Sequence, residues 1–472
     1  MKPRGESTHA VAGTEQPVVA TKFGNADGAK GSGPCKGFGV TAVTQSWRRT
    51  TEREETAEMT RQYNIPRKTV EEAWKRVKSN RGAAGIDGQT VEDFETRLDE
   101  NLYKIWNRMT SGSYFPPAVK AVEIPKNFGG TRLLGIPTVA DRVAQAVAKM
   151  YLEPNVEPKF HKDSYGYRPR RNQHHALAKA KERCWKYDWV LEIDIKGFFD
   201  NIDHSLMMEL VAKHTQEKWV VMYIDRWLKA DLKTTSGDLE QRERGAPQGS
   251  IIGPLLSNIF LHHAFDDWML ERHGDAPFER YADDLIVHCG SLEHAMYLKD
   301  AIAQRLKDWK LDINEQKTRI VYCKDSGRHG DFSQIEFTFL GYTFAPRRAR
   351  NRTTGNIFSS FQPAISRATE EKYRATIRAW ELQLRTAQTL EGIAGDINEK
   401  VRGWFNYSAR FYPSAMHPLY DYLNQRLIGW ALRKYKRLKG SPARAREFLV
   451  CIEVREPQLL AHWAWRHKRL LE

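Results

Sequence analysis

The stretch FERYADDLIVHC, residues 278–289, places two adjacent carboxylates, Asp283 and Asp284, directly before the β-type run 285–287. Two aspartates side by side repel each other, so the pair is costly unless it is exposed or shares a cation. Phosphoryl-transfer enzymes such as polymerases need such a pair, because two Mg²⁺ ions roughly 3.5–4 Å apart clamp the attacking and leaving oxygens. Aspartate is also a normal turn residue, so this stretch alone fits a polar turn between strands equally well.

A third carboxylate lies at the end of another predicted strand. In WVLEIDIKGFFDNIDH (189–204), Asp194 follows the strand 190–193, and metal sites tend to lie where strands of α/β sheets end. Together with the pair at 283–284, it completes a set of the hard oxygen ligands that Mg²⁺ prefers. Phe199 would place a bulky ring beside this metal, where it would block a ribose 2′-hydroxyl and select the deoxy sugar.

A predicted hairpin, AVKAVEIPKNFGGTRLLGIP (118–137), carries two cations close to its tip. Lys126 and Arg132 flank the Gly129-Gly130 turn. They are suited to gripping a triphosphate, the arginine through two parallel hydrogen bonds and the lysine as a point charge. Exposed basic residues are also ordinary on hairpins, so a purely structural interpretation stays open.

The segment 244–269 is a turn punctuated by glycine and proline that runs into an amphipathic helix. Gln248 and Gly249 allow the backbone to approach a base pair closely, so Gln248 is predicted to shape the floor beneath the nascent pair. Further along this helix, Asp266 and Asp267 form a second acidic pair. We interpret that pair as a solvated helix face and not as a metal site.

The composition favours a polyanionic partner. The chain has 472 residues, 41% of them hydrophobic, which is enough for two or three domains, and 74 Lys and Arg against 59 Asp and Glu give a net charge of +15. Such a charge points to nucleic acid before membrane, and no apolar run approaches the roughly 20 residues that a bilayer span needs. Five dispersed cysteines predict neither a disulfide framework nor a zinc site, and they suit a reducing compartment.

Three regions differ in pattern, and they predict an α+β chain. Residues 1–45 lack periodicity and are expected to form a disordered tail, residues 46–362 mix helical and strand patterns, and residues 363–472 follow the helical period. The last region contains an aromatic stripe at helical spacing that we interpret as core: Trp404, Tyr407 and Phe411.

Basic residues gather in three stretches: 165–171, 347–352 and 422–446. In the first, Tyr165 and Tyr167 interleave with arginines, which fits a surface that tracks a nucleic-acid backbone and stacks bases. The last holds eight Lys and Arg and no acid, which fits an RNA-backbone surface on a helix. Each stretch is also consistent with an ordinary solvated face.

Several blocks carry a family resemblance. Four resemble, in order, the blocks of reverse transcriptases: DIKGFFD (194–200), PQGSIIGPLLSN (247–258), YADD (281–284) and FLGY (339–342). Four more make the chain similar to group II intron-encoded reverse transcriptases, or maturases: GAAGIDG (82–88), LGIPTVADRV (134–143), SYGYRP (164–169) and RGWFNY (402–407). The resemblance runs from about residue 63 to the C-terminus, and the order and length of the blocks make it specific.

The resemblance implies a right-hand polymerase, with fingers and a palm built on an antiparallel sheet in residues 46–362. An α-helical thumb, or maturase domain, with a short basic extension would follow in residues 363–472. By the same resemblance, two Mg²⁺ ions are held by the three aspartates, Asp194, Asp283 and Asp284, with the Ile195 carbonyl adding one contact. The positions that match the dNTP pocket are Lys126, Arg132, Phe199 and Gln248. Gly341 lies where the family's primer-contacting turn occurs.

The resemblance also implies a biology. Such proteins bind their own group II intron RNA, assist its splicing and, given dNTPs, copy an RNA template from a DNA primer at a target DNA. The expected location is the bacterial cytoplasm, at the nucleoid when the protein is on DNA. Residues 462–472 contain no cysteine pair and no H-N-H motif, so second-strand cleavage is not expected, as in endonuclease-lacking bacterial lineages. Two alternatives are a retron, diversity-generating or defence-associated reverse transcriptase, and a non-enzymatic RNA-binding splicing factor.

Overall fold

The structure is a computed structural model that describes residues 62–80, 82–125, 131–351 and 353–471. The expected disordered tail and Lys126 lie outside these residues. None of the helices within them has the length and apolar content that a membrane crossing requires.

A group of helices forms the N-terminal side of the molecule: α2 (Arg67–Ser79), α3 (Val91–Thr96), α4 (Leu98–Thr110) and α5 (Val139–Val156). Thr90 caps the start of helix α3, because its hydroxyl accepts from the Asp93 N–H while the Asp93 carboxylate accepts from the Thr90 N–H. The predicted hairpin is β1 (Val119–Pro125) with β2 (Thr131–Ile136). Strand β1 also pairs in parallel with β4 (Leu232–Lys233), which pairs with β5 (Leu239–Glu240), so this small sheet is mixed and not purely antiparallel.

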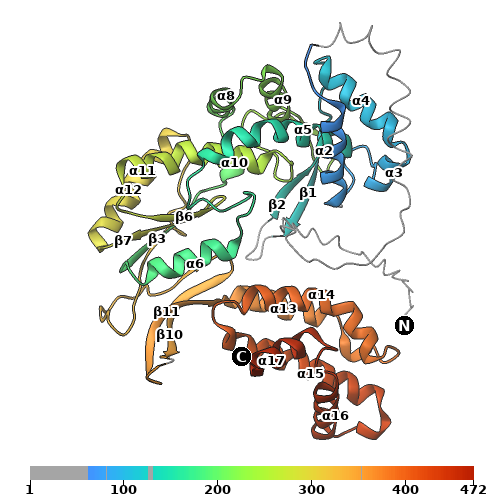
Figure 1. Cartoon of the computed structure of the whole chain (residues 1–472), viewed down its shortest axis with the longest axis vertical. Coiled ribbons are helices and arrows are strands. Elements are labelled where there is room, and N and C mark those ends of the chain that lie inside the picture. Colours follow the sequence, from blue (N-terminus) through green and yellow to red (C-terminus); the bar gives the residue numbers. More distant parts are fainter. Residues whose placement is uncertain (1–61, 81, 126–130, 352, 472) are drawn as a thin grey trace, which may run out of the picture.

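The central sheet is fully antiparallel and has the strand order β6-β7-β3-β8. Its strands are β3 (Trp189–Asp194), β6 (Phe278–Tyr281), β7 (Asp284–Cys289) and β8 (Arg319–Tyr322). The intervening helices are α6 (Gln173–Cys184), α7 (Phe198–Asn201), α8 (His204–His214), α9 (Lys218–Leu228), α10 (Gly253–Leu261), α11 (Asp267–Arg272) and α12 (Leu292–Asp308). Figure 1 shows α12 and α6 on opposite sides of this sheet.

Alternation along β3 assigns each of its side chains to one of these two sides. Leu191 and Ile193 join the large core shared with α10 and α12, whereas Val190 joins the smaller core around α6. Asp194 therefore faces the α6 side. On β7, Ile286 belongs to that same smaller core, so Asp284 faces the same side as Asp194.

A second hairpin leads from the palm into the C-terminal helices. Strand β9 (Phe337–Phe339) pairs with β10 (Tyr342–Arg350), and β10 pairs with β11 (Ile357–Ile365). Strand β11 therefore continues past residue 362, where the domain boundary was expected. Leu340 and Gly341, at φ 50° and 77°, form the two-residue turn, and positive φ at both positions is what a type I′ turn requires.

The C-terminal helices enclose a core of their own. They are α13 (Arg367–Ala379), α14 (Leu390–Ser408), α15 (His417–Lys434), α16 (Pro442–Arg455) and α17 (Ala461–Leu471). Trp404 stacks on Tyr373 and Trp380, with ring centroids 4.5 and 5.4 Å apart, so its interpretation as core is confirmed. Tyr407 and Phe411 pack instead against Tyr342 of the palm.

Candidate active site

Strand pairing brings the three predicted aspartates together. Asp194 is the register partner of Asp284 across β3 and β7, and Asp283 lies in the β6–β7 turn closed by the pair Tyr281 and Asp284. The turn is tight, because Ala282 adopts φ +58°, a region that residues other than glycine rarely occupy. Two carboxylates directly opposite each other, with a third in the adjoining turn, make one acidic face at the edge of the palm sheet.

A fourth carboxyl group lies on this face beside the aspartates. Glu192 lies on the same side of β3 as Asp194, and burial, together with the charges of Asp284 and Asp194, raises its pKa to about 7 although nearby Arg319 opposes the shift. The Lys317 ammonium lies 3.4 Å from Asp194 Oδ2. Like charges in register destabilise a sheet unless a cation offsets them, so this donor set of hard oxygens fits a divalent ion.

A cavity of about 250 Å³ opens beside these carboxylates. Its wall includes Glu192, Asp194 and Asp284 together with Lys317 and Arg319. Charged groups of both signs therefore line the space. Glu192 was missed at the level of sequence, although its position two residues before Asp194 on the same strand was the signal for it.

Ile195, the predicted backbone contact of the metal, directly follows Asp194 at the end of β3. Its side chain is buried in the palm core, and the residue pairs with Ile313 in an isolated bridge. The two hydrogen bonds of that bridge run from Asn314 N–H to the Asp194 carbonyl and from Lys196 N–H to the Asp312 carbonyl. The pairing thus uses neither polar group of Ile195, so its carbonyl role remains a prediction.

The catalytic turn rests on two other stretches of the chain. A Cβ added to Gly166 would lie 2.3 Å from the Ala282 nitrogen, so only glycine fits beneath the turn. Asn258 donates to the Gly166 carbonyl at 2.7 Å and accepts from Arg280 NH1 at 2.9 Å. The same guanidinium nitrogen donates to the Ala282 carbonyl at 3.2 Å. The stretches SYGYRP, PQGSIIGPLLSN and YADD are therefore locked to one another by backbone and side-chain contacts.

The interpretation of Asp266 as part of a solvated helix face is wrong. Its side chain is fully buried and accepts two hydrogen bonds from Arg280, from Nε at 2.7 Å and from NH2 at 2.5 Å. Asp267, in contrast, is 40% exposed. Burial of an arginine beneath the turn demands a buried acid, which the helical periodicity alone does not reveal.

Gln248 and Phe199, two of the predicted nucleotide-binding residues, belong to segments that are hydrogen-bonded to each other. Gln248 donates through Nε2 to Asp200 Oδ1 at 3.0 Å, and Ala246 N–H donates to the Phe199 carbonyl at 2.8 Å. The Gln248 carbonyl accepts from Gly135 N–H at 2.7 Å, so this turn joins β2 to the Phe199 loop. The Phe199 ring is 8% exposed and packs against Phe198.

The two predicted triphosphate contacts belong to the stretch 118–137. Arg132 lies in β2, where its register partner is Ile124 of β1. Lys126 lies outside the described residues. Their roles remain predictions.

Two family models match the chain: "Reverse transcriptase (RNA-dependent DNA polymerase)" at residues 124–344 and "Group II intron, maturase-specific domain" at residues 371–448. The group II intron-encoded protein LtrA of Lactococcus lactis subsp. cremoris is 36% identical over 342 residues, which cover 59% of this chain and 55% of that protein. The protein YkfC of Escherichia coli (strain K12) is 30% identical over 312 residues, 58% of this chain and 79% of YkfC. This chain belongs to the group II intron-encoded reverse transcriptases and maturases.

Membership makes the chain, by class, an RNA-directed DNA polymerase that depends on divalent metal and carries an intron-RNA-binding maturase domain. A putative COX1/OXI3 intron 1 protein of Saccharomyces cerevisiae (strain ATCC 204508 / S288c) is also similar, 28% identical over 197 residues, 42% of this chain and 23% of that protein. The match spans about half of the length of the Lactococcus protein.

Hydrogen bonds join the reverse transcriptase palm to the maturase helices at the Leu340-Gly341 turn. Tyr407 of α14 donates its hydroxyl to the Leu340 carbonyl at 2.6 Å. The Gly341 carbonyl accepts from Ser366 N–H at 3.0 Å and from Thr369 Oγ1 at 3.1 Å, both at the start of α13. A turn expected to contact the primer is thereby fixed by the maturase domain.

The basic stretches contain both structural and free cations. Arg168 is an internal brace that donates to Glu157 and to the carbonyls of His161 and Ser164, so its assignment to a nucleic-acid surface is wrong. Lys434 donates to the carbonyls of Thr386 (2.9 Å) and Gln388 (2.8 Å). The exposed cations among the described residues of these stretches are Arg170, Arg348, Arg350, Arg433, Lys436, Arg437, Lys439, Arg444 and Arg446.

Proposed function

We propose that this chain copies its own intron RNA into DNA from a DNA primer at Asp194, Asp283 and Asp284, and that it assists splicing of that RNA. The observation that carries the proposal is the register pairing of Asp194 with Asp284, with Asp283 in the adjoining turn. Two Mg²⁺ ions held by these carboxylates and the Ile195 carbonyl would neutralise charge on the attacking and leaving oxygens. Phosphoryl transfer needs positioning and charge neutralisation more than covalent help, which suits a site without a nucleophile.

Other residues of the chain orient the catalytic turn and bind the nucleotide. Arg280, held by Asp266 and Asn258, fixes the carbonyl that precedes Asp283 and so orients the turn. Gln248 and Gly249 form the floor for the nascent base pair, Phe199 selects dNTPs by excluding the 2′-hydroxyl, and Lys126 and Arg132 hold the triphosphate. The exposed cations Arg433, Lys436 and Arg437, at the end of α15 and in the turn that follows it, carry the intron RNA, and target DNA supplies the primer. This activity takes place in the cytoplasm.

Primer extension on an RNA template tests the proposal. Asp194→Asn should abolish DNA synthesis, because it removes charge from the middle of the ligand set. Asp275→Asn is the matched control, since Asp275 lies just before β6 and its side chain is 75% exposed. Sequencing the RNA that copurifies with the chain tests the maturase half: a structured intron supports it, and random cellular RNA contradicts it.

A further inference from the structure

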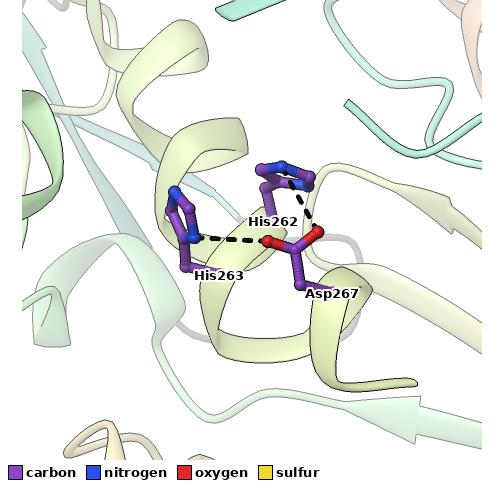
Figure 2. Close-up of side chains that lie close together, drawn as sticks. All are labelled: His262, His263 and Asp267. Carbon is purple, nitrogen blue, oxygen red and sulfur yellow. Dashed lines mark ion pairs between the residues drawn. The ribbon is translucent and has the colours of Figure 1, made fainter. Parts of the chain in front are cut away.

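The side chains of His262, His263 and Asp267 lie close together between α10 and α11 (Figure 2). None of the three is a catalytic aspartate. Residues His262–Asp266 form a π-helical turn, in which Asp267 N–H donates to the His262 carbonyl five residues back. His262 Nε2 lies 3.4 Å from Asp267 Oδ1, and His263 Nδ1 lies 3.3 Å from Oδ2. The wider turn therefore aims both rings at one carboxylate, and π turns of this kind are frequent at functional sites.

The spacing of these atoms suits a metal of the zinc class. Bonds of 2.0–2.1 Å in a tetrahedral shell separate neighbouring ligand atoms by about 3.3 Å. One ligand atom from each of the three side chains lies within 4.8 Å of the other two. Imidazole nitrogen selects zinc, cobalt, nickel, copper or iron over magnesium, so this donor set differs in kind from the carboxylates of the polymerase site.

His262 offers its ligand atom from a buried position. The residue is 5% exposed, and Nε2 is the ring atom that faces Asp267. Its Nδ1 is buried and has no hydrogen-bond partner among the described residues. Asp266 Oδ2 is 3.9 Å from this atom, which is beyond hydrogen-bond distance.

His263, in contrast, has a hydrogen-bond partner behind its ring. Its Nε2 lies 2.8 Å from Nε2 of His214, from the end of α8. With a metal on Nδ1 of His263, the single proton of its neutral ring is on Nε2 and is donated to Nε2 of His214, which then carries its own ring proton on Nδ1. Lys159 Nζ lies 3.3 Å from His214 Nδ1, and an ammonium only donates, so it favours the opposite proton order and opposes metal entry.

We propose that His262, His263 and Asp267 bind one divalent transition-metal ion of the zinc class, with water completing its coordination. The ion would tie the π turn to α8 through His214. It would also hold the helix segment that carries Asp266, the partner of Arg280 beneath the catalytic turn. The ion stabilises the folded chain and takes no part in phosphoryl transfer. A ligand that binds only the folded state raises the thermal midpoint with its concentration.

The test uses the full chain, stripped of metal and titrated with Co²⁺ or Zn²⁺ in a large excess of Mg²⁺, which saturates the carboxylate site. The expected result is one equivalent of Co²⁺ with the visible spectrum of mixed imidazole and carboxylate ligation, displaced by Zn²⁺, and a higher thermal midpoint. Asp267→Asn and His263→Gln should each weaken Zn²⁺ binding at least tenfold. His262→Gln should do the same, and because His262 is buried the two more exposed variants keep the test valid if it fails to fold.

Two further variants sharpen the test. His175→Gln, at the exposed second histidine of the chain's other His-His pair, should bind Zn²⁺ like the parent. Lys159→Gln should bind several-fold more tightly, because it removes the ammonium that opposes metal entry. The absence of saturable Zn²⁺ binding in excess Mg²⁺, or unchanged affinity in both Asp267→Asn and His263→Gln, would overturn the proposal.

Discussion

Arg280 and Asp266 form a fully buried, two-point ion pair directly beneath the turn that carries Asp283. The guanidinium continues to the Ala282 carbonyl, one residue before the catalytic pair, and to Asn258, whose amide in turn holds Gly166. A buried charge pair adds little net stability, because desolvation offsets the attraction. We infer that this pair is there to hold the turn in its left-handed geometry at Ala282.

Removing one partner of this pair should be costly. Asp266→Asn leaves the arginine charge buried without its acid, and breaking such a pair costs about 3–5 kcal/mol of unfolding free energy. The double variant Asp266→Leu with Arg280→Met removes both charges and should recover most of that loss. DNA synthesis should nevertheless stay low in the double variant, because the Ala282 carbonyl loses its donor. Thermal unfolding and primer extension on the same preparations separate the two effects, and full activity in the stable double variant would contradict the positioning role.

Phe199 tests the sugar selection. Replacing it with valine should raise incorporation of rNTPs relative to dNTPs by at least tenfold, because the smaller side chain leaves room for the 2′-hydroxyl. The ratio of kcat/KM for the two substrates is the measurement. Phe198→Leu, at the neighbouring buried ring, controls for loss of packing. Equal discrimination in Phe199→Val and the parent would contradict the assignment.

The basic residues between 433 and 437 should include cations that bind RNA and one cation that stabilises the fold. Neutralising Arg433, Lys436 and Arg437 to glutamine should weaken intron RNA binding and reduce the slope of log K against log salt, because each phosphate contact releases about one counterion. Lys434→Gln should lower the thermal midpoint and leave the salt slope unchanged, since Lys434 bonds to two backbone carbonyls. An unchanged slope in the triple variant would mean that this face is merely solvated.

His462 predicts a dependence of stability on pH. Complete burial lowers its pKa to about 3, against an ordinary value near 6.5 in the unfolded chain. The folded state therefore excludes a proton that the unfolded state binds, and stability is full above about pH 6.5 and falls as the pH drops toward 3. Between pH 7 and 5 the loss is about 2 kcal/mol for this group.

The measurement is the thermal midpoint at both pH values. His462→Gln should show a smaller decrease than the parent, and the exposed His329→Gln variant should behave like the parent. Equal decreases in all three proteins would exclude His462 as the source.

The sequence predicted what adjacent residues and strand periodicity determine. The turn at 281–284, the strand ending at Asp194 and the hairpin at 118–137 all depend on neighbouring residues, and the structure confirms each of them. The same reasoning could have placed Glu192 beside Asp194, because residues two apart on a strand share a face.

What escaped prediction depends on partners far apart in the chain. Asp266 is buried only because Arg280 lies against it, and Arg168 is internal because it reaches Glu157 and two carbonyls. Lys434 leaves the RNA surface because the loop before α14 offers it carbonyls. A charged residue on a helix has the same appearance in the sequence whether it is solvated or paired, so such assignments require tertiary contacts.

The most direct test of the central claim is DNA synthesis on an RNA template by the double variant Asp283→Asn with Asp284→Asn, alongside binding of intron RNA. The account predicts loss of synthesis by at least a thousandfold, with RNA affinity within a few-fold of the parent and an unchanged thermal midpoint. Polymerisation retained at a substantial rate in this folded variant would contradict the assignment of the metal-binding carboxylates.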